Sequence, residues 1–260
     1  MKNRMNNFRV TILGSGTCVP LLSRSSCSVL LETGESRVVF DCGAGTMRRL
    51  LEAGVTVFDV THLFFSHFHP DHTGEMASFL FANKYASAPQ RTTPLLLAGG
   101  RGFYKFFENY KTVYGHWLEL PDRLLQFGEF DVSQADRADF ADFSVTTRPV
   151  CHQPESIAFR VEKGGRSMVY SGDTDVADNL VTLAEGADLL ICESALPDHL
   201  KTEGHLTPSL AGRVARKAGV KKLVLTHLYP ECDEVDIKAQ CARIYNGEIV
   251  VAEDLMQFGL

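Results

Sequence analysis

The chain has 260 residues, of which 45% are hydrophobic and 22% are charged. This composition is that of an ordinary globular protein and excludes disordered and fibrous classes, and the length suits one large domain or at most two small ones. The formal net charge of −6 provides no overall positive field for a polyanion, so a dedicated tRNA or DNA binder is disfavoured, whereas an enzyme for a small phosphate ester is not.

Short apolar runs separated by turn signals recur along the chain and predict strands. The first runs follow one another directly, as strands of a hairpin do, and the later ones alternate with stretches of helical spacing. The predicted strands cover residues 10–13, 27–31, 38–40, 61–65, 94–97, 157–161, 167–170, 189–192 and 222–225.

Helical spacing of apolar residues predicts the connecting helices, three of which end at a glycine that suits a helix C-terminus. The alternation of strands and helices predicts an α/β protein built in layers. No linker or repeat divides the sequence, so we expect a single domain over residues 1–260. Residues 129–142 are rich in acids and predict a solvated loop. The predicted helices cover residues 46–53, 76–84, 102–114, 176–185 and 207–218.

The seven cysteines are odd in number, widely spread and without a C-x-x-C motif. They therefore indicate neither a disulfide framework nor a thiolate zinc site, and they fit a reducing compartment. The polar N-terminus leads into only a short apolar run, and no stretch approaches the roughly 18 consecutive apolar residues of a membrane span. We expect a cytoplasmic protein with no membrane partner.

A dense group of potential metal ligands directly follows the strand predicted at residues 61–65. His67 and His69 are two residues apart, which in an extended segment leaves both imidazoles on one side, able to reach one metal. Asp71 and His72 lie around the following turn and can reach a second metal. Imidazoles at this density have no structural purpose on a surface, and such clusters mark metal or catalytic sites. The segment therefore predicts a site for two metals.

A metal needs ligands from more than one loop, and three further candidates each stand where an apolar run stops. These are His152, Asp173 and His227. Taken alone, each is more often a capping or turn residue. Functional sites of α/β proteins usually lie at the ends of strands, so beside the cluster we assign all three to the metal site.

This pattern of histidines and aspartates resembles the metallo-β-lactamase superfamily, whose fold is a four-layer αβ/βα sandwich with one or two metals at its edge. The likeness covers nearly the whole chain. Further segments resemble the ribonuclease Z-like group of phosphodiesterases, namely residues 13–17 (LGSGT), 40–46 (FDCGAGT), 170–174 (YSGDT), 204–207 (GHLT) and 225–227 (LTH).

The resemblance implies a set of ligands for two divalent ions. The donors are nitrogen and oxygen atoms, which suit zinc, manganese or iron, and the resemblance implies zinc. The first ion would be held by His67, His69 and His152, the second by Asp71, His72 and His227, and Asp173 would bridge the two.

The resemblance also implies a dinuclear hydrolase that acts on a phosphodiester. Two ions about 3.5–4 Å apart would generate a metal-bridging hydroxide and neutralise charge on the phosphoryl oxygens. Asp71 would orient that hydroxide, and His205 would be the catalytic histidine that protonates the leaving oxygen or stabilises the phosphorane. Glu193 is the expected partner of His205. For Asp41, on a glycine-rich loop, two roles stay open: holding a ligand imidazole or capping a buried turn.

The sequence departs from ribonuclease Z in two places. Residues 153–172 leave no room for the long arm with which that enzyme grips the body of tRNA. Residues 229–234 are acidic where the tRNA enzyme carries a basic residue. We therefore expect a small substrate, a cyclic nucleotide or an RNA 3′ end, and no strong nucleic-acid-binding surface. Dimers are common among the proteins it resembles, so a homodimer is a further expectation, although the sequence indicates no interface.

Three other functions stay open. A lactone, thioester or β-lactam hydrolase uses the same fold. The missing export signal and the presence of Asp71 disfavour the β-lactam case, and the GHLT segment, which resembles phosphodiesterases, disfavours the other two. A tRNA 3′ endoribonuclease fits the motifs but lacks the arm. A degenerate binding module without activity is the alternative outside enzymes, and it conflicts with the presence of every expected ligand. An iron–oxygen redox protein would need a carboxylate where His69 stands.

Overall fold

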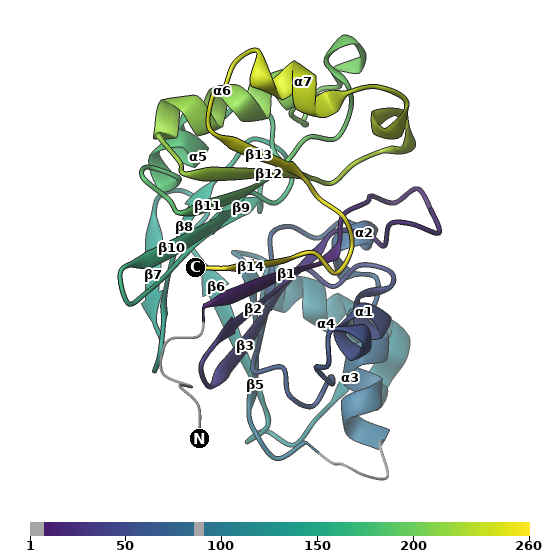
Figure 1. Cartoon of the computed structure of the whole chain (residues 1–260). Coiled ribbons are helices and arrows are strands. Elements are labelled where there is room, and N and C mark those ends of the chain that lie inside the picture. Colours follow the sequence, from purple (N-terminus) through teal and green to yellow (C-terminus); the bar gives the residue numbers. More distant parts are fainter. Residues whose placement is uncertain (1–7, 86–90) are drawn as a thin grey trace.

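Strands that are buried along their whole length form the centre of the fold. β2 (Ser28–Thr33) and β11 (Leu189–Glu193) consist of buried residues only, and such strands need a covering layer on each face. The computed structural model, which describes residues 8–85 and 91–260, provides these layers by packing two sheets together with helices outside them (Figure 1).

The first sheet contains both the first and the last strand. Its three N-terminal strands pair as antiparallel neighbours, and the next three add in parallel. The last strand returns to pair antiparallel with the first, with Val10 opposite Phe258. In order across the sheet the strands are β14 (Gln257–Gly259), β1 (Arg9–Gly14), β2, β3 (Ser36–Phe40), β4 (His62–Phe65), β5 (Leu95–Gly100) and β6 (Leu125–Phe130).

The second sheet also mixes parallel and antiparallel pairs. Its strands at the C-terminal side run parallel, whereas β7, β8, β9 and β10 form antiparallel pairs. In order they are β13 (Glu248–Val251), β12 (Lys222–Thr226), β11, β10 (Arg166–Tyr170), β9 (Ile157–Lys163), β8 (Ser144–Pro149) and β7 (Asp136–Asp139).

Three apolar cores separate four layers. The central core joins Phe40 and Phe64 of the first sheet to Phe159 and Tyr170 of the second. One outer core lies between the first sheet and its helices, and the other lies between the second sheet and its helices. The predicted four-layer αβ/βα sandwich is confirmed. The first sheet is covered by α1 (Thr46–Glu52), α3 (Met76–Tyr85) and α4 (Phe103–Tyr114), and the second by α5 (Asp178–Leu183), α6 (Pro208–Ala218) and α7 (Ile237–Ala242).

The acidic stretch at residues 129–142 was predicted as a solvated loop, and this was wrong for residues 129–130 and 136–139. Its first residues complete β6, and its centre is β7, the edge strand of the second sheet. Along β7 half-buried and exposed residues alternate, and Ala138 packs against the central core. The acidic residues masked the strand pattern in the sequence, because an edge strand exposes one face to water, where charged side chains are favoured.

The parallel strands bring distant segments to one edge of the sandwich. In the first sheet β3 and β4 end together, with Phe40 opposite Phe64. In the second sheet β10, β11 and β12 end together, with Glu193 opposite Thr226. The loops that follow these strands therefore meet, as the strand-end argument expects. Among the residues described, none of the helices combines the length and the apolar character needed to cross a bilayer.

Candidate metal centre

A short helix folds the loop after β4 back on itself. α2 (Pro70–Thr73) starts with a proline, which suits the first turn because the missing N–H would have no helical partner. His69 precedes it in an extended conformation, and its carbonyl accepts a hydrogen bond from the amide of His72 at 3.0 Å. His67 and His69 therefore lie before the turn, and Asp71 and His72 lie within it, as the sequence predicted.

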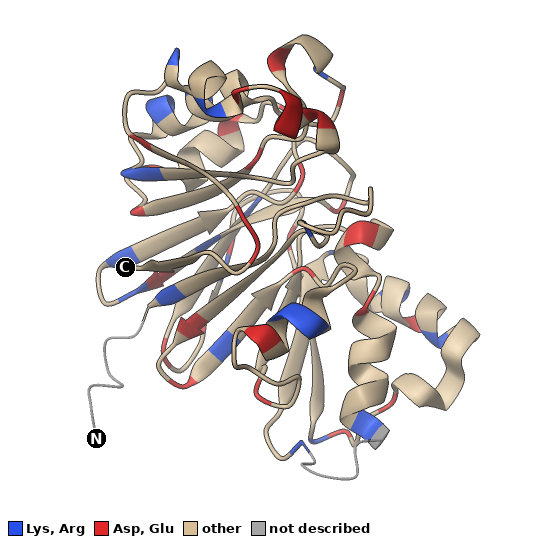
Figure 2. Cartoon of the chain, turned by 45° about the vertical axis from the view of Figure 1, so that its right-hand side comes forward, with Lys and Arg blue, Asp and Glu red and all other residues tan. Residues whose placement is uncertain are grey.

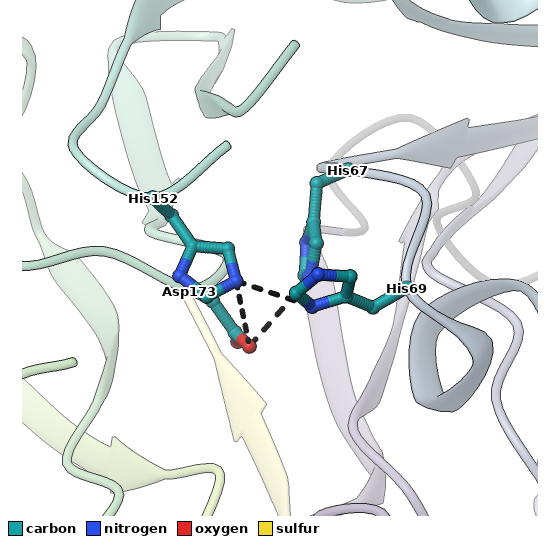
Figure 3. A group of neighbouring side chains, drawn as sticks. All are labelled: His67, His69, His152 and Asp173. Atoms are coloured by element: carbon teal, nitrogen blue, oxygen red, sulfur yellow. Dashed lines mark hydrogen bonds and ion pairs between the residues drawn. The ribbon is translucent and has the colours of Figure 1, made fainter. Parts of the chain in front are cut away.

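The second sheet supplies the side chains that face this loop. His152 follows β8 and Asp173 follows β10, and one ligand atom from each lies within 4.8 Å of its counterparts on His67 and His69. Nε2 of His152 is 3.2 Å from Nδ1 of His69 and 4.0 Å from Oδ2 of Asp173. Figure 3 shows His67 and His69 approaching from one loop and His152 from the opposite side.

A second group of ligand atoms lies beside the first. It consists of Asp71, His72 and His227, again within 4.8 Å of one another. Asp173 lies between the groups: its Oδ1 is 3.3 Å from Nε2 of His72, and its Oδ2 is 3.3 Å from Nε2 of His227 and 3.7 Å from Nε2 of His67. The structure thus brings all seven predicted ligands together, with one carboxylate shared by both groups.

The donors of this cluster fit divalent metal ions. Nε2 of His67, His72 and His227 and Oδ1 of Asp173 are buried and have no hydrogen-bond partner among the described residues. A buried polar atom without a partner is costly, and four such atoms directed at one region imply a ligand that accepts lone pairs. Imidazole nitrogens and carboxylate oxygens are the donors that such metals use.

The carboxylates control the charge of the cluster. Burial acts to raise the pKa of Asp173, but His227 and His72 outweigh it and hold that pKa well below its usual range. Burial acts to lower the pKa of His72, but Asp173 and Asp41 raise it well above normal. At His67 the effect of burial is larger than the attraction of Asp173, and the pKa of His67 is lowered. The carboxylates are therefore ionised and attract cations to this edge.

His205 stands beside the two groups with Glu193 behind it. Its Nδ1 is 3.0 Å from Oε1 of Glu193, the partner expected from the sequence. Burial acts to lower the pKa of His205, but the hydrogen bond and the charge of Glu193 outweigh it and raise that pKa. The ring stacks on His227 with 5.5 Å between centroids, and a ligand atom of His205 lies within 4.8 Å of ligand atoms of Asp173 and His227.

Glu193 is fixed by the backbone around it. It is buried, its Oε1 accepts a hydrogen bond from the amide of Thr174 at 2.7 Å, and its Oε2 accepts one from the amide of Leu206 at 3.0 Å. Burial raises the pKa of this carboxyl. Glu193 therefore has a fixed position, and it fixes the ring of His205.

Other groups hold the rear nitrogens of the imidazoles. Nδ1 of His72 is 2.7 Å from Oδ2 of Asp41, so Asp41 takes the first of its two proposed roles. Nδ1 of His152 is 3.0 Å from the carbonyl oxygen of Gly204. The sequence analysis missed this carbonyl, together with Ser66 and Tyr170, which contact Asp41. Ser66 directly follows β4 and Tyr170 ends β10, and these strand-end positions were the only sequence features that could have pointed to the two residues.

Comparisons with known proteins agree with this geometry. Residues 36–228 match the model of the beta-lactamase superfamily domain. Ribonuclease Z of Methanothermobacter thermautotrophicus is 27% identical over 301 aligned positions, covering 96% of this chain and 95% of that protein. Ribonuclease Z of Streptomyces avermitilis is 28% identical, covering 97% of this chain and 98% of that protein.

Solved structures share the same architecture. The short form of human tRNase Z superimposes with a TM-score of 0.78 and 26% identity, covering 96% of this chain and 98% of that one. The metallo-beta-lactamase fold protein YhfI from Bacillus subtilis has a TM-score of 0.84 and 22% identity, covering 98% of this chain and 100% of that one. The two-sheet sandwich is therefore common to these proteins along nearly their whole length.

Proposed function

Because the chain belongs to the beta-lactamase superfamily, whose domain model matches its residues 36–228, we propose that it is a dinuclear metal-dependent phosphodiesterase. The observation that carries this proposal is the position of Asp173 between two groups of three ligand side chains each. Its Oδ2 lies near His67 of the first group and His227 of the second, and its Oδ1 lies near His72 of the second, so this carboxylate is suited to join two cations. The similarity to ribonuclease Z supports phosphodiesters as the substrate class.

We assign two divalent ions to the cluster, zinc being the metal that best suits tetrahedral histidine-rich sites. Bound there, the ions would lower the pKa of coordinated water and neutralise charge on the phosphoryl group. One ion is assigned to His67, His69 and His152, the other to Asp71, His72 and His227, with Asp173 shared.

The remaining chemistry belongs to side chains of this chain. Asp71 is half-buried at the edge of the second group, where its carboxylate can accept a hydrogen bond from an attacking water and orient it. His205 is the general acid, which donates a proton to the leaving oxygen. Glu193 holds Nδ1 of His205 and thereby leaves Nε2 for that proton.

The substrate is proposed to be a small phosphodiester, such as a cyclic nucleotide, or an RNA 3′ end. Between His152 and Asp173 the chain forms only β9, a turn at Gly164 and Gly165, and β10, so it has no arm to grip a tRNA body. The 301 positions aligned with ribonuclease Z exceed the 260 residues of this chain, which agrees with a missing segment. Basic and acidic residues are interspersed along the ribbon in the view of Figure 2.

The seven cysteines are all unpaired, which supports a reducing compartment. We therefore propose that the enzyme works in the cytoplasm.

The proposed activity is tested with the zinc-loaded protein and two sets of substrates. We expect hydrolysis of bis(p-nitrophenyl) phosphate and none of a panel of lactones and thioesters. The variant Asp173→Asn keeps the size of the side chain but loses the shared charge, so it should be inactive. Hydrolysis of the lactones with an inert phosphodiester would contradict the proposal.

A second assay separates small substrates from tRNA. Cyclic nucleotides and short RNA with a free 3′ end are compared with a tRNA precursor. We expect turnover of the small substrates to be faster. A clear preference for the precursor would instead support the tRNA 3′ endoribonuclease.

A further inference from the structure

One buried carboxylate, that of Asp41, collects four hydrogen bonds directly behind the metal centre. Its Oδ1 accepts from the amide of Ser66 at 2.7 Å. Its Oδ2 is within hydrogen-bond distance of the Ser66 hydroxyl at 2.8 Å, Nδ1 of His72 at 2.7 Å and the Tyr170 hydroxyl at 2.6 Å. All four residues are at most 1% exposed, so the network lies away from the protein surface.

The carboxylate determines where the surrounding protons lie. A carboxylate can only accept hydrogen bonds, so the neighbours of the Asp41 carboxylate must donate. With a metal ion in place of the proton on Nε2, His72 would keep its other proton on Nδ1, toward Asp41, and direct the lone pair of Nε2 to that ion. No lysine or arginine forms an ion pair with Asp41 in the described part of the chain, so neutral hydroxyl and amide donors and the His72 ring hold its charge.

Ser66 extends this control to the other group of ligands. Its hydroxyl proton is directed at Asp41, and its oxygen is left to accept a hydrogen bond from Nδ1 of His67 at 3.0 Å. His67 then also presents the lone pair of Nε2 to the centre. One network thus fixes the tautomer of one imidazole in each of the two ligand groups.

Tyr170 is the member of this network that comes from the other sheet. It ends β10, whereas Asp41 and Ser66 follow strands of the first sheet. Its ring packs on Phe40 across the central core, with 5.8 Å between centroids. Its hydroxyl also lies 3.4 Å from Sγ of Cys27, a weak partner compared with the carboxylate. The Tyr170 hydroxyl therefore donates its hydrogen bond to Asp41.

We propose that Tyr170 is a positioning residue of the metal centre, whose hydroxyl fixes the Asp41 carboxylate and through it the ligand tautomers of His72 and His67. The inference rests on the proposed two-metal site. Without the Tyr170 hydroxyl, Oδ2 loses one of its three donors, and nothing from the second sheet holds the carboxylate against His72. The partners behind metal-binding histidines set affinity, and their loss typically weakens it about 10–100-fold.

The test compares Tyr170→Phe with the matched variant Tyr245→Phe. Tyr245 is also a buried tyrosine, and its hydroxyl donates to the carbonyl of Val220 at 2.8 Å, so Tyr245→Phe removes a buried hydroxyl and its hydrogen bond without touching the Asp41 network. Each metal-free protein is titrated with Zn²⁺ against a chromophoric chelator. We expect two ions on the wild-type chain, affinity for at least one of them weakened about 10–100-fold in Tyr170→Phe, and unchanged affinities in Tyr245→Phe.

The visible spectrum of the Co²⁺-loaded proteins provides a second readout. It reports the arrangement of ligands, so it should change in Tyr170→Phe and stay as in the wild type in Tyr245→Phe. If Tyr170→Phe does not fold, Ser66→Ala tests the same network, because it removes the acceptor of His67 and one donor to Asp41, and the same loss of affinity is expected.

Two results would overturn the inference. Zinc affinities and a Co²⁺ spectrum equal to those of the wild type in a folded Tyr170→Phe protein, or in Ser66→Ala where it replaces that variant, would show that the network only supports packing. Fewer than two ions on the wild-type chain would contradict the proposed function itself, and the inference with it. The wild-type titration distinguishes these failures.

Discussion

His205 occupies a position from which it can donate a proton or bind a metal. Its Nδ1 is held by Glu193, yet a ligand atom of its ring lies close to ligand atoms of Asp173 and His227. We expect His205→Ala to lower kcat by about 10²–10⁴ and to leave the number of bound ions unchanged. Metal analysis of the purified variant decides the role: loss of an ion from His205→Ala would make it a ligand.

His62 predicts an acid-sensitive contribution to stability far from any predicted ligand. Its ring lies among Phe64, Phe140 and Phe143, and burial lowers its pKa from 6.5 to about 4, against the attraction of Asp142. The folded state therefore favours the neutral ring, while the unfolded state takes up a proton below about pH 6.5.

The free energy of unfolding should consequently fall as the pH drops from about 6.5 to about 4, by up to about 3 kcal/mol from this residue. His62→Phe keeps the aromatic packing and removes the titration. Urea unfolding at several pH values should show a flatter acid branch for this variant than for the wild type. Parallel pH profiles of the two proteins would contradict the assignment.

Much of the site was predictable residue by residue, because a metal needs particular side chains. His67, His69, Asp71 and His72 form a pattern that has no common structural use, and they are recognisable by type alone. Ser66 and Tyr170 were not, because a serine and a tyrosine at strand ends are ordinary core residues. Only their distances to Asp41 give them a role.

Among the elements, the segment between β13 and β14 connects parts of the first sheet that are distant in sequence. Asp254 is 4% exposed at its side chain. Its Oδ1 accepts from the amide and hydroxyl of Ser15, and its Oδ2 accepts from the amide of Ser25 and from Nε of Arg49. One carboxylate thus joins the β1–β2 loop, helix α1 and the C-terminal segment.

Asp254→Ala should destabilise the protein by about 2–4 kcal/mol, because it leaves the amides of Ser15 and Ser25 without their acceptor, at about 1–3 kcal/mol for each buried donor. It also removes one of the two carboxylates that contact Arg49. Asp233→Ala is the matched control: it also removes a partner of an arginine, Arg24, but its side chain is 50% exposed, and such pairs contribute less than about 1 kcal/mol. Denaturant unfolding measures both. Equal effects of the two substitutions would contradict the assigned role of Asp254.

Elements with a clear apolar run were predictable, whereas β8, an inner strand of the second sheet, and the strands at the sheet edges were not. β7 and β14 are short edge strands, so half of their residues face water and the period of two is masked. β14 also pairs with β1 at the opposite end of the chain, and no local pattern indicates such a partner. The outline of strands and helices therefore followed from sequence, whereas the sheet edges needed tertiary contacts.

For the whole molecule, the predicted ligands connect the two halves of the sandwich. Four of them belong to the loop after β4 in the first sheet, and His152, Asp173 and His227 follow strands of the second. Metal binding should therefore stabilise the packing of the sheets. At a free-ion concentration about 100 times the dissociation constant, each ion adds about 2.7 kcal/mol.

A chelator should accordingly lower the midpoint of thermal unfolding, and Zn²⁺ added back should restore it. The fold class was predictable at this scale because strand and helix alternation and the ligand pattern point to the same sandwich. The way in which one sheet packs on the other was not predictable, because it depends on tertiary contacts such as the stacking of Phe64 on Phe159. A midpoint that does not respond to chelation would show that the ions do not join the halves.

The central claim is that seven side chains from both sheets hold two cations with Asp173 between them. Anomalous difference maps from crystals of the zinc-loaded protein test it most directly. The account predicts two peaks, one beside His67, His69 and His152 and one beside Asp71, His72 and His227. A single peak, or none at this edge of the sandwich, would contradict it.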